Sequence, residues 1–338
     1  MTTENKKANK KANQNPIGAL IFGDTPPLRI SEICRNLENS GFSELWVAED
    51  YFQLSGFAGA ALALNATRDV TVGIGAISGR VRHPAVTAME AATLAGAYPG
   101  RFKLGIGHGV PAWTEQMDLK PKSFLKSFNE CTTSVKRLLA GETLNEKGEY
   151  YSFSEVKLAH PAPDLDVLGA VVGPNSTDLC AEISDGIILS VLSGPKYVES
   201  VRENVGKIRS AKGLAPDFDI VTYVLASVGD DKAEVRAGLR GVAAFYLDAM
   251  GATKMTGVYG VNDQLQEMID QGGAAVIEKD MPDEWMDWLT IGGTPEDCIS
   301  SIRNLFDAGT TSIVLCLMPT SDIDTQIKRF SETVLPNI

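Results

Sequence analysis

A few polar residues of this chain follow apolar runs, at points where they could carry out acid–base chemistry. Glu49 and Asp50 follow the run LWVA, Asp24 follows ALIFG, and His108 follows KLGIG. Carboxylates and imidazole can donate or accept a proton, so we expect general acid–base catalysis from Asp50, Glu49 or His108. Solvated or structural carboxylates, and a histidine that only caps a loop, are the alternative interpretations.

A second candidate site is the segment VVGPNST, which ends one apolar run and begins a stretch of helical period. Free backbone N–H groups at a helix N-terminus bind phosphate, and hydroxyl side chains add further donors. Capping of the helix by Asn175 or Ser176 explains the same residue types equally well. The residues of this candidate phosphate site are Val172, Gly173, Pro174, Asn175, Ser176 and Thr177.

Basic residues that follow the third apolar run offer a contact for an anionic ligand. Arg80, Arg82 and His83 stand there, although the same residues could simply lead into the next helix. The histidines of the chain, His83, His108 and His160, lack the spacing of metal ligands, so we predict no metal site. The sequence also contains no P-loop, G-x-S-x-G or H-E-x-x-H motif.

The elements that must position these residues are eight short apolar runs that alternate with stretches of helical period. Such alternation predicts a parallel sheet with right-handed crossovers, and eight units close naturally into an α/β fold of the (β/α)8 TIM-barrel type. A doubly wound open sheet is the alternative. In a barrel the carboxyl ends of the strands form the functional face. The runs are Pro16–Gly23, Ser43–Glu49, Val70–Ile77, Arg101–Gly107, Val167–Gly173, Gly186–Val191, Phe218–Ser227 and Ser312–Met318.

Glycines inside the third and fourth runs are unusual for a filled barrel, whose interior favours bulky side chains. The alternation of each run places Gly73, Gly75, Gly105 and Gly107 on the inward face. We expect the missing side chains to open a slot for a planar aromatic cofactor. Local packing or β-bulges at these glycines are the alternative.

We expect one barrel domain over residues 16–338, with insertions at about 142–166 and 229–311. The first insertion contains GEYYSFSEVKL, which predicts a β-hairpin. Long insertions at the C-terminal rim of a barrel commonly shape the substrate site. Residues 1–15 are polar and rich in Lys and Asn, which predicts a flexible tail and no signal peptide.

The composition of the chain limits the classes of partner that the protein is expected to bind. The chain has 31 Lys and Arg against 43 Asp and Glu, a net charge of −12, which disfavours nucleic acids and anionic membrane surfaces. No apolar stretch approaches the ~18 residues of a membrane span. The five cysteines form no CxxC pair, which is typical of buried free thiols in the cytoplasm. A small-molecule substrate fits this composition.

The run GIGAISGRVRHPAVTAMEAATLAGAYPGRFKLGIGHG resembles the luciferase-like superfamily of flavin and deazaflavin proteins. Further resemblance lies in LWVAEDYF, in VVGPNSTDLCAEISDGIIL and in GGTPEDCISSIRNLFDAGTTSIVL, so that it extends from about Ile17 to Phe330. Within the superfamily the sequence is most similar to the branch that uses coenzyme F420, which includes the methylenetetrahydromethanopterin reductases. The resemblance implies the same barrel.

This resemblance implies an F420-dependent oxidoreductase that transfers a hydride between the deazaflavin and an organic substrate. An FMN-dependent two-component monooxygenase and a non-catalytic flavin-binding barrel are the alternatives. Both cofactors carry a flat tricyclic ring and a ribityl phosphate. The implied phosphate site is the VVGPNST segment, and the implied ring site comprises Gly75, Ala76, Ile77 and Gly107.

Three further properties follow from the resemblance. Family members often have a non-proline cis peptide at the end of the third strand, which alignment places at Gly75-Ala76. They are usually homodimers, with contacts from helices that here correspond to Phe57–Leu64 and Ala85–Ala97. The chain departs from the F420 branch at Glu49-Asp50, where an Asp-His pair is common, and at His108, where many members have a carboxylate. Both positions lie near the reacting ring in the family, so the particular reaction stays open.

Overall fold

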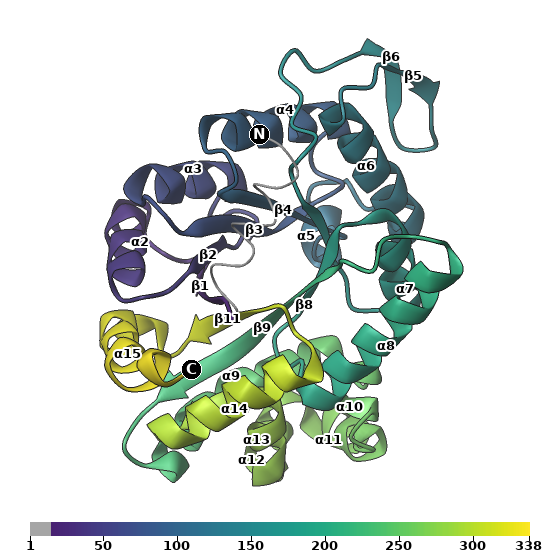
Figure 1. The fold of residues 1–338 in the computed structure, drawn as a ribbon. Helices are drawn as coiled ribbons and strands as arrows, with labels where there is room; N and C mark the ends of the chain where they lie inside the picture. Colours follow the sequence, from purple (N-terminus) through teal and green to yellow (C-terminus); the bar gives the residue numbers. More distant parts are fainter. Residues whose placement is uncertain (1–14) are drawn as a thin grey trace.

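The computed structural model describes residues 15–338, and its main feature is a closed barrel of parallel strands (Figure 1). β1 pairs with β2 and β11, and β8 pairs with β9, so that the sheet closes on itself. The predicted (β/α)8 barrel is confirmed, and each of the eight predicted runs contains one strand. The barrel strands are β1 (Ile17–Ile21), β2 (Glu44–Val47), β3 (Thr71–Ser78), β4 (Phe102–Gly107), β7 (Val167–Ala170), β8 (Gly186–Leu189), β9 (Asp219–Val228) and β11 (Ser312–Leu317).

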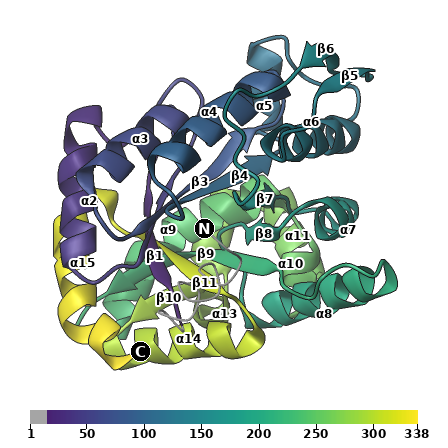
Figure 2. The ribbon, with the colours of Figure 1, turned by 45° about the horizontal axis from the view of Figure 1, so that its top comes forward.

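A ring of helices covers the outside of these strands and buries their apolar side chains. Where the chain turns from a helix into the next strand, Gly41, Gly100 and Gly309 adopt the predicted left-handed conformation. The C-terminal helix α15 lies beside α2, next to the junction of the last and first strands (Figure 2). The covering helices are α2 (Ile30–Asn39), α3 (Gly56–Ala66), α4 (Pro84–Ala97), α6 (Phe124–Leu139), α7 (Pro174–Ile183), α8 (Pro195–Ala211), α14 (Pro295–Ala308) and α15 (Ile323–Arg329).

The interior of the barrel corrects one expectation about the strand glycines. A Cβ added to Gly73 would collide with the ring of Trp46, and one added to Gly75 would collide with the hydroxyl of Tyr223. The Trp46 and Tyr223 rings meet edge to face, with their centroids 5.9 Å apart. The predicted slot is therefore wrong at this depth, because aromatic side chains from β2 and β9 fill the space that these glycines leave.

The other two inward glycines approach backbone atoms of neighbouring strands. A Cβ at Gly105 would lie 2.5 Å from the carbonyl oxygen of Ile74, and one at Gly107 would lie 2.9 Å from that of Ala170. The register of β3 against β4 also shifts between Ile74 and Ile77. Local packing and a strand irregularity, the alternative interpretation, therefore account for the strand glycines.

The opposite end of the barrel, where the strands begin, is closed by a buried ion-pair network. The Lys103 Nζ lies 3.3 Å from carboxylate oxygens of both Glu44 and Asp219. Glu44 also accepts hydrogen bonds from Trp46 Nε1 at 2.9 Å and from Ser312 Oγ at 2.6 Å. The carboxylates hold the pKa of Lys103 above its usual value despite the burial. A paired, buried network of this kind leaves the carboxyl ends of the strands as the open face.

The first insertion forms the predicted hairpin from β5 (Leu144–Lys147) and β6 (Ser152–Val156). It stands outside the helix ring, next to α4 and α6 (Figure 1). The Tyr151 hydroxyl donates to the carbonyl oxygen of Gly79, and the His83 ring packs against Phe153 at 5.0 Å. The hairpin is thus tied to the loop between β3 and α4.

The second insertion is mainly helical and adds one strand that the sequence did not predict. β10 (Thr290–Gly293) pairs in parallel with the last residues of β9. Its four residues include two glycines, so it lacks the apolar pattern of the other strands. The helices are α9 (Lys232–Met250), α10 (Lys254–Gly257), α11 (Asn262–Gly272), α12 (Ala274–Asp280) and α13 (Asp283–Leu289). Within residues 15–338, no helix combines the length and apolar character that crossing a membrane requires.

Candidate active site

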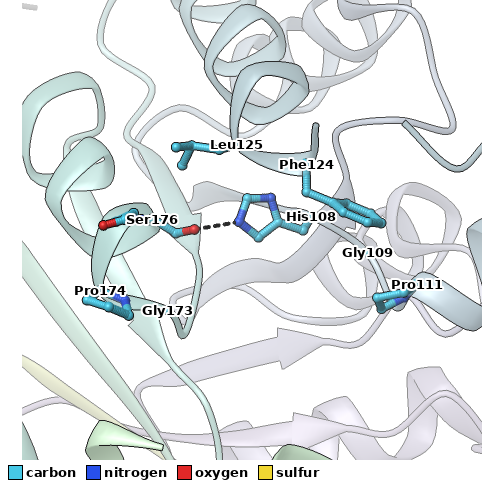
Figure 3. A pocket seen from close by; sticks show the side chains of 9 residues that line it. His108, Gly109, Pro111, Phe124, Leu125, Gly173, Pro174 and Ser176 are labelled. Atoms are coloured by element: carbon cyan, nitrogen blue, oxygen red, sulfur yellow. Dashed lines mark hydrogen bonds between the residues drawn. The ribbon is translucent and has the colours of Figure 1, made fainter. Parts of the chain in front are cut away.

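A cavity of about 470 Å³ opens at the carboxyl ends of β4 and β7 (Figure 3). It brings His108 together with most of the predicted phosphate segment, although the two are far apart in sequence. These residues come together because β4 and β7, which precede them in the chain, pair directly in the barrel. The lining residues are His108, Gly109, Pro111, Phe124, Leu125, Gly173, Pro174, Asn175 and Ser176.

Three helices begin at this cavity. α5 (Pro111–Gln116) starts at Pro111, α6 at Phe124 and α7 at Pro174, and all three of these residues line the cavity. The first N–H groups of a helix have no partner within the helix and carry partial positive charge, although Pro111 and Pro174 themselves have no N–H. The convergence makes the local potential favourable for an anion, although the chain as a whole is acidic.

The start of α7 distinguishes between phosphate binding and simple capping. Its N-cap residue is Gly173, and no side chain in the described part of the chain caps it. Capping by Asn175 or Ser176 is therefore wrong, because both lie within the first turn. α6, by contrast, is capped in the usual way by the Ser123 hydroxyl, which accepts from the Lys126 N–H. The uncapped donors of α7 fit an oxyanion such as phosphate.

His108 contacts the phosphate segment directly. Its Nε2 lies 2.9 Å from the Ser176 hydroxyl oxygen, and the contact is drawn in Figure 3. The ring packs edge-on against Phe128 and Phe124, with centroid separations of 5.2 and 6.1 Å. Its Nδ1 is buried, without a hydrogen-bond partner among residues 15–338. Burial lowers the pKa of His108, so the ring is neutral at neutral pH.

Asp50 lies at the carboxyl end of β2, on the same face of the barrel. Burial raises the pKa of Asp50, and the nearby carboxylates of Asp24 and Glu49 raise it further, against an opposing hydrogen bond from the backbone of Gly23. A carboxyl group with a raised pKa holds its proton closer to neutral pH. Asp50 therefore has the electrostatic setting of an acid–base residue.

The carboxylate of Glu49, the residue before Asp50, is held in an ion pair. Its two carboxylate oxygens accept from the Arg82 guanidinium at 2.6 and 2.8 Å, and Oε2 also accepts from the Gly56 N–H at 2.9 Å. Both oxygens are therefore engaged in a bidentate pair, and acid–base catalysis by Glu49 stays a prediction. Its role is to hold the end of β2 against the start of α3 and the loop before α4.

The basic residues after β3 are also engaged within the protein. Arg82 pairs with Glu49, and the Arg80 Nε donates to the carbonyl oxygen of Leu119 at 3.1 Å. The His83 Nδ1 accepts from the Ala85 N–H at 3.2 Å and so caps α4. The alternative interpretation of these residues, a structural lead into the next helix, is the one that the structure supports.

The predicted ring-binding residues lie between the two sites just described. Gly75, Ala76 and Ile77 belong to β3, which is flanked by β2 with Asp50 at its end and by β4 with Gly107. The predicted cis peptide at Gly75-Ala76 is confirmed. The predicted site residues therefore lie on, or follow, four consecutive strands of the barrel, β2, β3, β4 and β7.

Three aromatic residues at this face were missed by the sequence reasoning. The rings of Tyr51 and Trp113 lie 5.7 Å apart, joining the loops after β2 and β4. Tyr246 reaches the face from α9, where burial first, and then the charges of Cys316, Asp50 and Asp24, raise its pKa to about 12. Tyr51 falls in the LWVAEDYF run, but Trp113 and Tyr246 come from segments without a recognisable pattern. In residues 15–338 no cluster of three or more His, Cys, Asp or Glu side chains is arranged to hold a metal ion.

Comparison with known proteins gives consistent results. The family model described as luciferase-like monooxygenase matches residues 10–312. A 5,10-methylenetetrahydromethanopterin reductase of Archaeoglobus fulgidus is 27% identical over 309 residues, covering 89% of this chain and 93% of the relative. An F420-dependent glucose-6-phosphate dehydrogenase of Nakamurella multipartita is 26% identical, covering 92% and 93%. The solved structure of the F420-dependent tetrahydromethanopterin reductase of Methanopyrus kandleri matches with a TM-score of 0.82 at 21% identity, covering 96% of this chain and 99% of that one.

Proposed function

Because the chain belongs to the luciferase-like monooxygenase family, we propose that it is an F420-dependent oxidoreductase, similar to the methylenetetrahydromethanopterin reductases. It would transfer a hydride between the deazaflavin and an organic substrate. The observation that carries this proposal is the uncapped start of α7 beside His108, at the carboxyl ends of the barrel strands. The relatives named above support F420 as the cofactor.

The start of α7, which no side chain of the described residues caps and which lies at the wall of the cavity, fits the phosphate group of such a cofactor. In the segment Gly173 to Thr177, the Asn175 and Ser176 N–H groups and the Ser176 hydroxyl would hold the phosphate. Pro174 has no N–H, and the N–H and hydroxyl of Thr177 already donate to the Gly173 carbonyl, so these two residues would shape the turn that Val172 leads into. Gly75, Ala76, Ile77 and Gly107 would support the ring from the ends of β3 and β4. When bound, the deazaflavin supplies the hydride chemistry, and the protein supplies orientation, exclusion of water and a proton.

Asp50 is the residue of this chain that we assign to proton transfer. Its carboxyl is half-buried and close to other carboxylates, so it can hold a proton and release it to the substrate or take one from it. The Glu49–Arg82 pair fixes the backbone next to Asp50. Proton transfer by His108 stays a prediction; the position of its Nε2 on Ser176 places the ring on the phosphate side of the site.

The family itself supports a second candidate function, an FMN-dependent two-component monooxygenase, because its description is that of a monooxygenase. Such an enzyme would use the same cradle for the FMN phosphate. A non-catalytic flavin-binding barrel is the third candidate. Binding of F420 without turnover over a broad substrate panel would favour that one. The substrate is a small organic molecule, and no contact with nucleic acid or membrane is proposed.

We also propose that the active form is a homodimer in the cytoplasm. α3 and α4, which contain the predicted contact segments, expose apolar side chains at Leu62, Val86 and Met89, with 40, 42 and 53% of each exposed. Contact with a second copy would bury this patch. Light scattering at micromolar concentration is expected to give the mass of a dimer, and a monomer mass would contradict the proposal.

Substitution of Gly173 by Val tests the phosphate cradle. We expect the dissociation constant for F420 to rise about tenfold or more, because a branched side chain blocks close approach of the phosphate to the backbone. The fold should tolerate the change, since a Cβ at Gly173 meets no atom within 4 Å and its φ is −72°. The Gly206→Val variant, where a Cβ also meets nothing within 4 Å, is the matched control on α8. Unchanged affinity in Gly173→Val, at unchanged melting temperature, would remove the assignment.

A further inference from the structure

We infer that His108 is an anion-binding residue, which takes up a proton when the cofactor phosphate binds and so makes cofactor affinity depend on pH. The inference rests on the proposed function, because it deepens the role of the same site. It differs from the expectation that His108 exchanges a proton with the substrate. The observation that supports the inference is the contact between the His108 Nε2 and the Ser176 hydroxyl, at the wall of the 470 Å³ cavity.

The geometry places the ring next to the bound anion. Ser176 belongs to the first turn of α7, whose N–H groups would hold the phosphate, and its hydroxyl lies 2.9 Å from the imidazole. An anion on the first turn is therefore separated from the ring by one hydroxyl group at most. An imidazolium there would add a charge-assisted contact to the neutral donors of the backbone.

The surroundings of His108 explain why it is neutral without a ligand. The elements that contact the ring are α6 and α7, which face it with Phe124, Phe128 and Ser176. None of these side chains carries a charge, and burial among them lowers the pKa of His108. A phosphate brings the negative charge that the pocket lacks, and so raises the pKa again.

The direction of the pH effect follows from the difference in the pKa of His108 between the free protein and the phosphate complex. The pKa of His108 lies below its usual value of ~6.5 in the free protein and rises when the phosphate binds. The extra affinity is therefore complete below the pKa of the free protein and is lost as pH rises through the pKa of the complex. The phosphodiester of F420 keeps one negative charge throughout, so the part of the pH dependence that is lost in His108→Gln reports the histidine.

The test compares dissociation constants for F420 between about pH 5.5 and pH 8.5 in the wild type, His108→Gln and His160→Gln. We expect affinity of the wild type to fall about tenfold across this range, the size of one charge-assisted hydrogen bond. His108→Gln should show the weaker affinity at every pH, and His160→Gln, altered at an exposed histidine, should behave as the wild type. A deazaflavin that lacks the phosphate should show no dependence on pH or on His108.

Three results of this comparison would overturn the inference. One is the same pH dependence in His108→Gln as in the wild type. Another is an equal loss of affinity for the phosphate-free deazaflavin, which a purely structural role would produce. Normal affinity with reduced turnover would assign His108 to proton transfer instead, and so also overturn it.

Inorganic phosphate separates this inference from the cofactor assignment. If F420 does not bind at all, the proposed function fails, but the histidine can still be followed by NMR. Addition of phosphate should raise the pKa of the His108 ring. No change in the His108 titration would overturn the inference without reference to any cofactor.

Discussion

Replacing Asp50 with Asn is expected to lower turnover about 10²-fold or more, with F420 affinity close to that of the wild type. The reason is the setting of the carboxyl group: it is half-buried beside Asp24 and Glu49, which raises its pKa and lets it hold a proton. Asn has the same shape but cannot exchange a proton in this way. An effect on turnover without an effect on binding is the signature of a group that acts in the transition state.

Two measurements separate catalysis from structure in this experiment. The pH–rate profile of the wild type should contain a limb from Asp50, displaced upward from the usual carboxyl pKa, and the Asp50→Asn variant should lack it. The Asp24→Asn variant is the matched control, because Asp24 is an exposed carboxylate beside the same site. We expect a small effect there, through the pKa of Asp50. Unimpaired turnover in Asp50→Asn would contradict this assignment. Another donor, such as His108 or water, would then supply the proton.

Variants of Glu49 are not equivalent to variants of Asp50. Glu49→Gln would break the bidentate pair and leave the half-buried Arg82 guanidinium with its longer contact to Glu90, at 3.4 Å. Its consequences would fall on stability, substrate affinity and turnover together. A rate loss in a Glu49 variant is therefore no sign of acid–base catalysis by that residue.

The strands and their order could be predicted from sequence, because each buried parallel strand forms one continuous apolar run. The same order also brings His108 to Ser176, since β4 and β7 are neighbours in any such barrel. β10 could not be predicted in this way. Its residues TIGG offer no apolar pattern, and only pairing with the end of β9 makes them a strand.

The roles of the glycines and of Glu49 needed the structure. The sequence indicates that Gly73 and Gly75 face inward, but not that Trp46 and Tyr223 fill the space beside them. That depends on which side chains from distant strands meet at one depth of the barrel. The pair between Glu49 and Arg82 likewise joins residues 33 positions apart in the chain. Neighbouring carboxylates such as Glu49 and Asp50 look alike in sequence and differ only through such partners.

The second large effect that we expect is a difference in affinity between the two candidate cofactors. We expect F420 to bind at least about 100-fold more tightly than FMN, equivalent to roughly 2.7 kcal/mol. The support is the similarity to F420-dependent relatives over most of both chains, together with a cradle that fits the phosphate of either cofactor. Because the phosphate contacts are shared, selectivity must come from the ring site at the ends of β3 and β4 and from the groups beyond the phosphate.

The most direct test of the account is a titration of the purified protein with F420 and, separately, with FMN, followed by absorbance and fluorescence. The account predicts saturable binding of F420 at micromolar concentrations or below, no comparable binding of FMN, and weakened F420 binding in the Gly173→Val variant. Tight binding of FMN, with no binding of F420, would contradict it and assign the chain to the monooxygenase branch of its family.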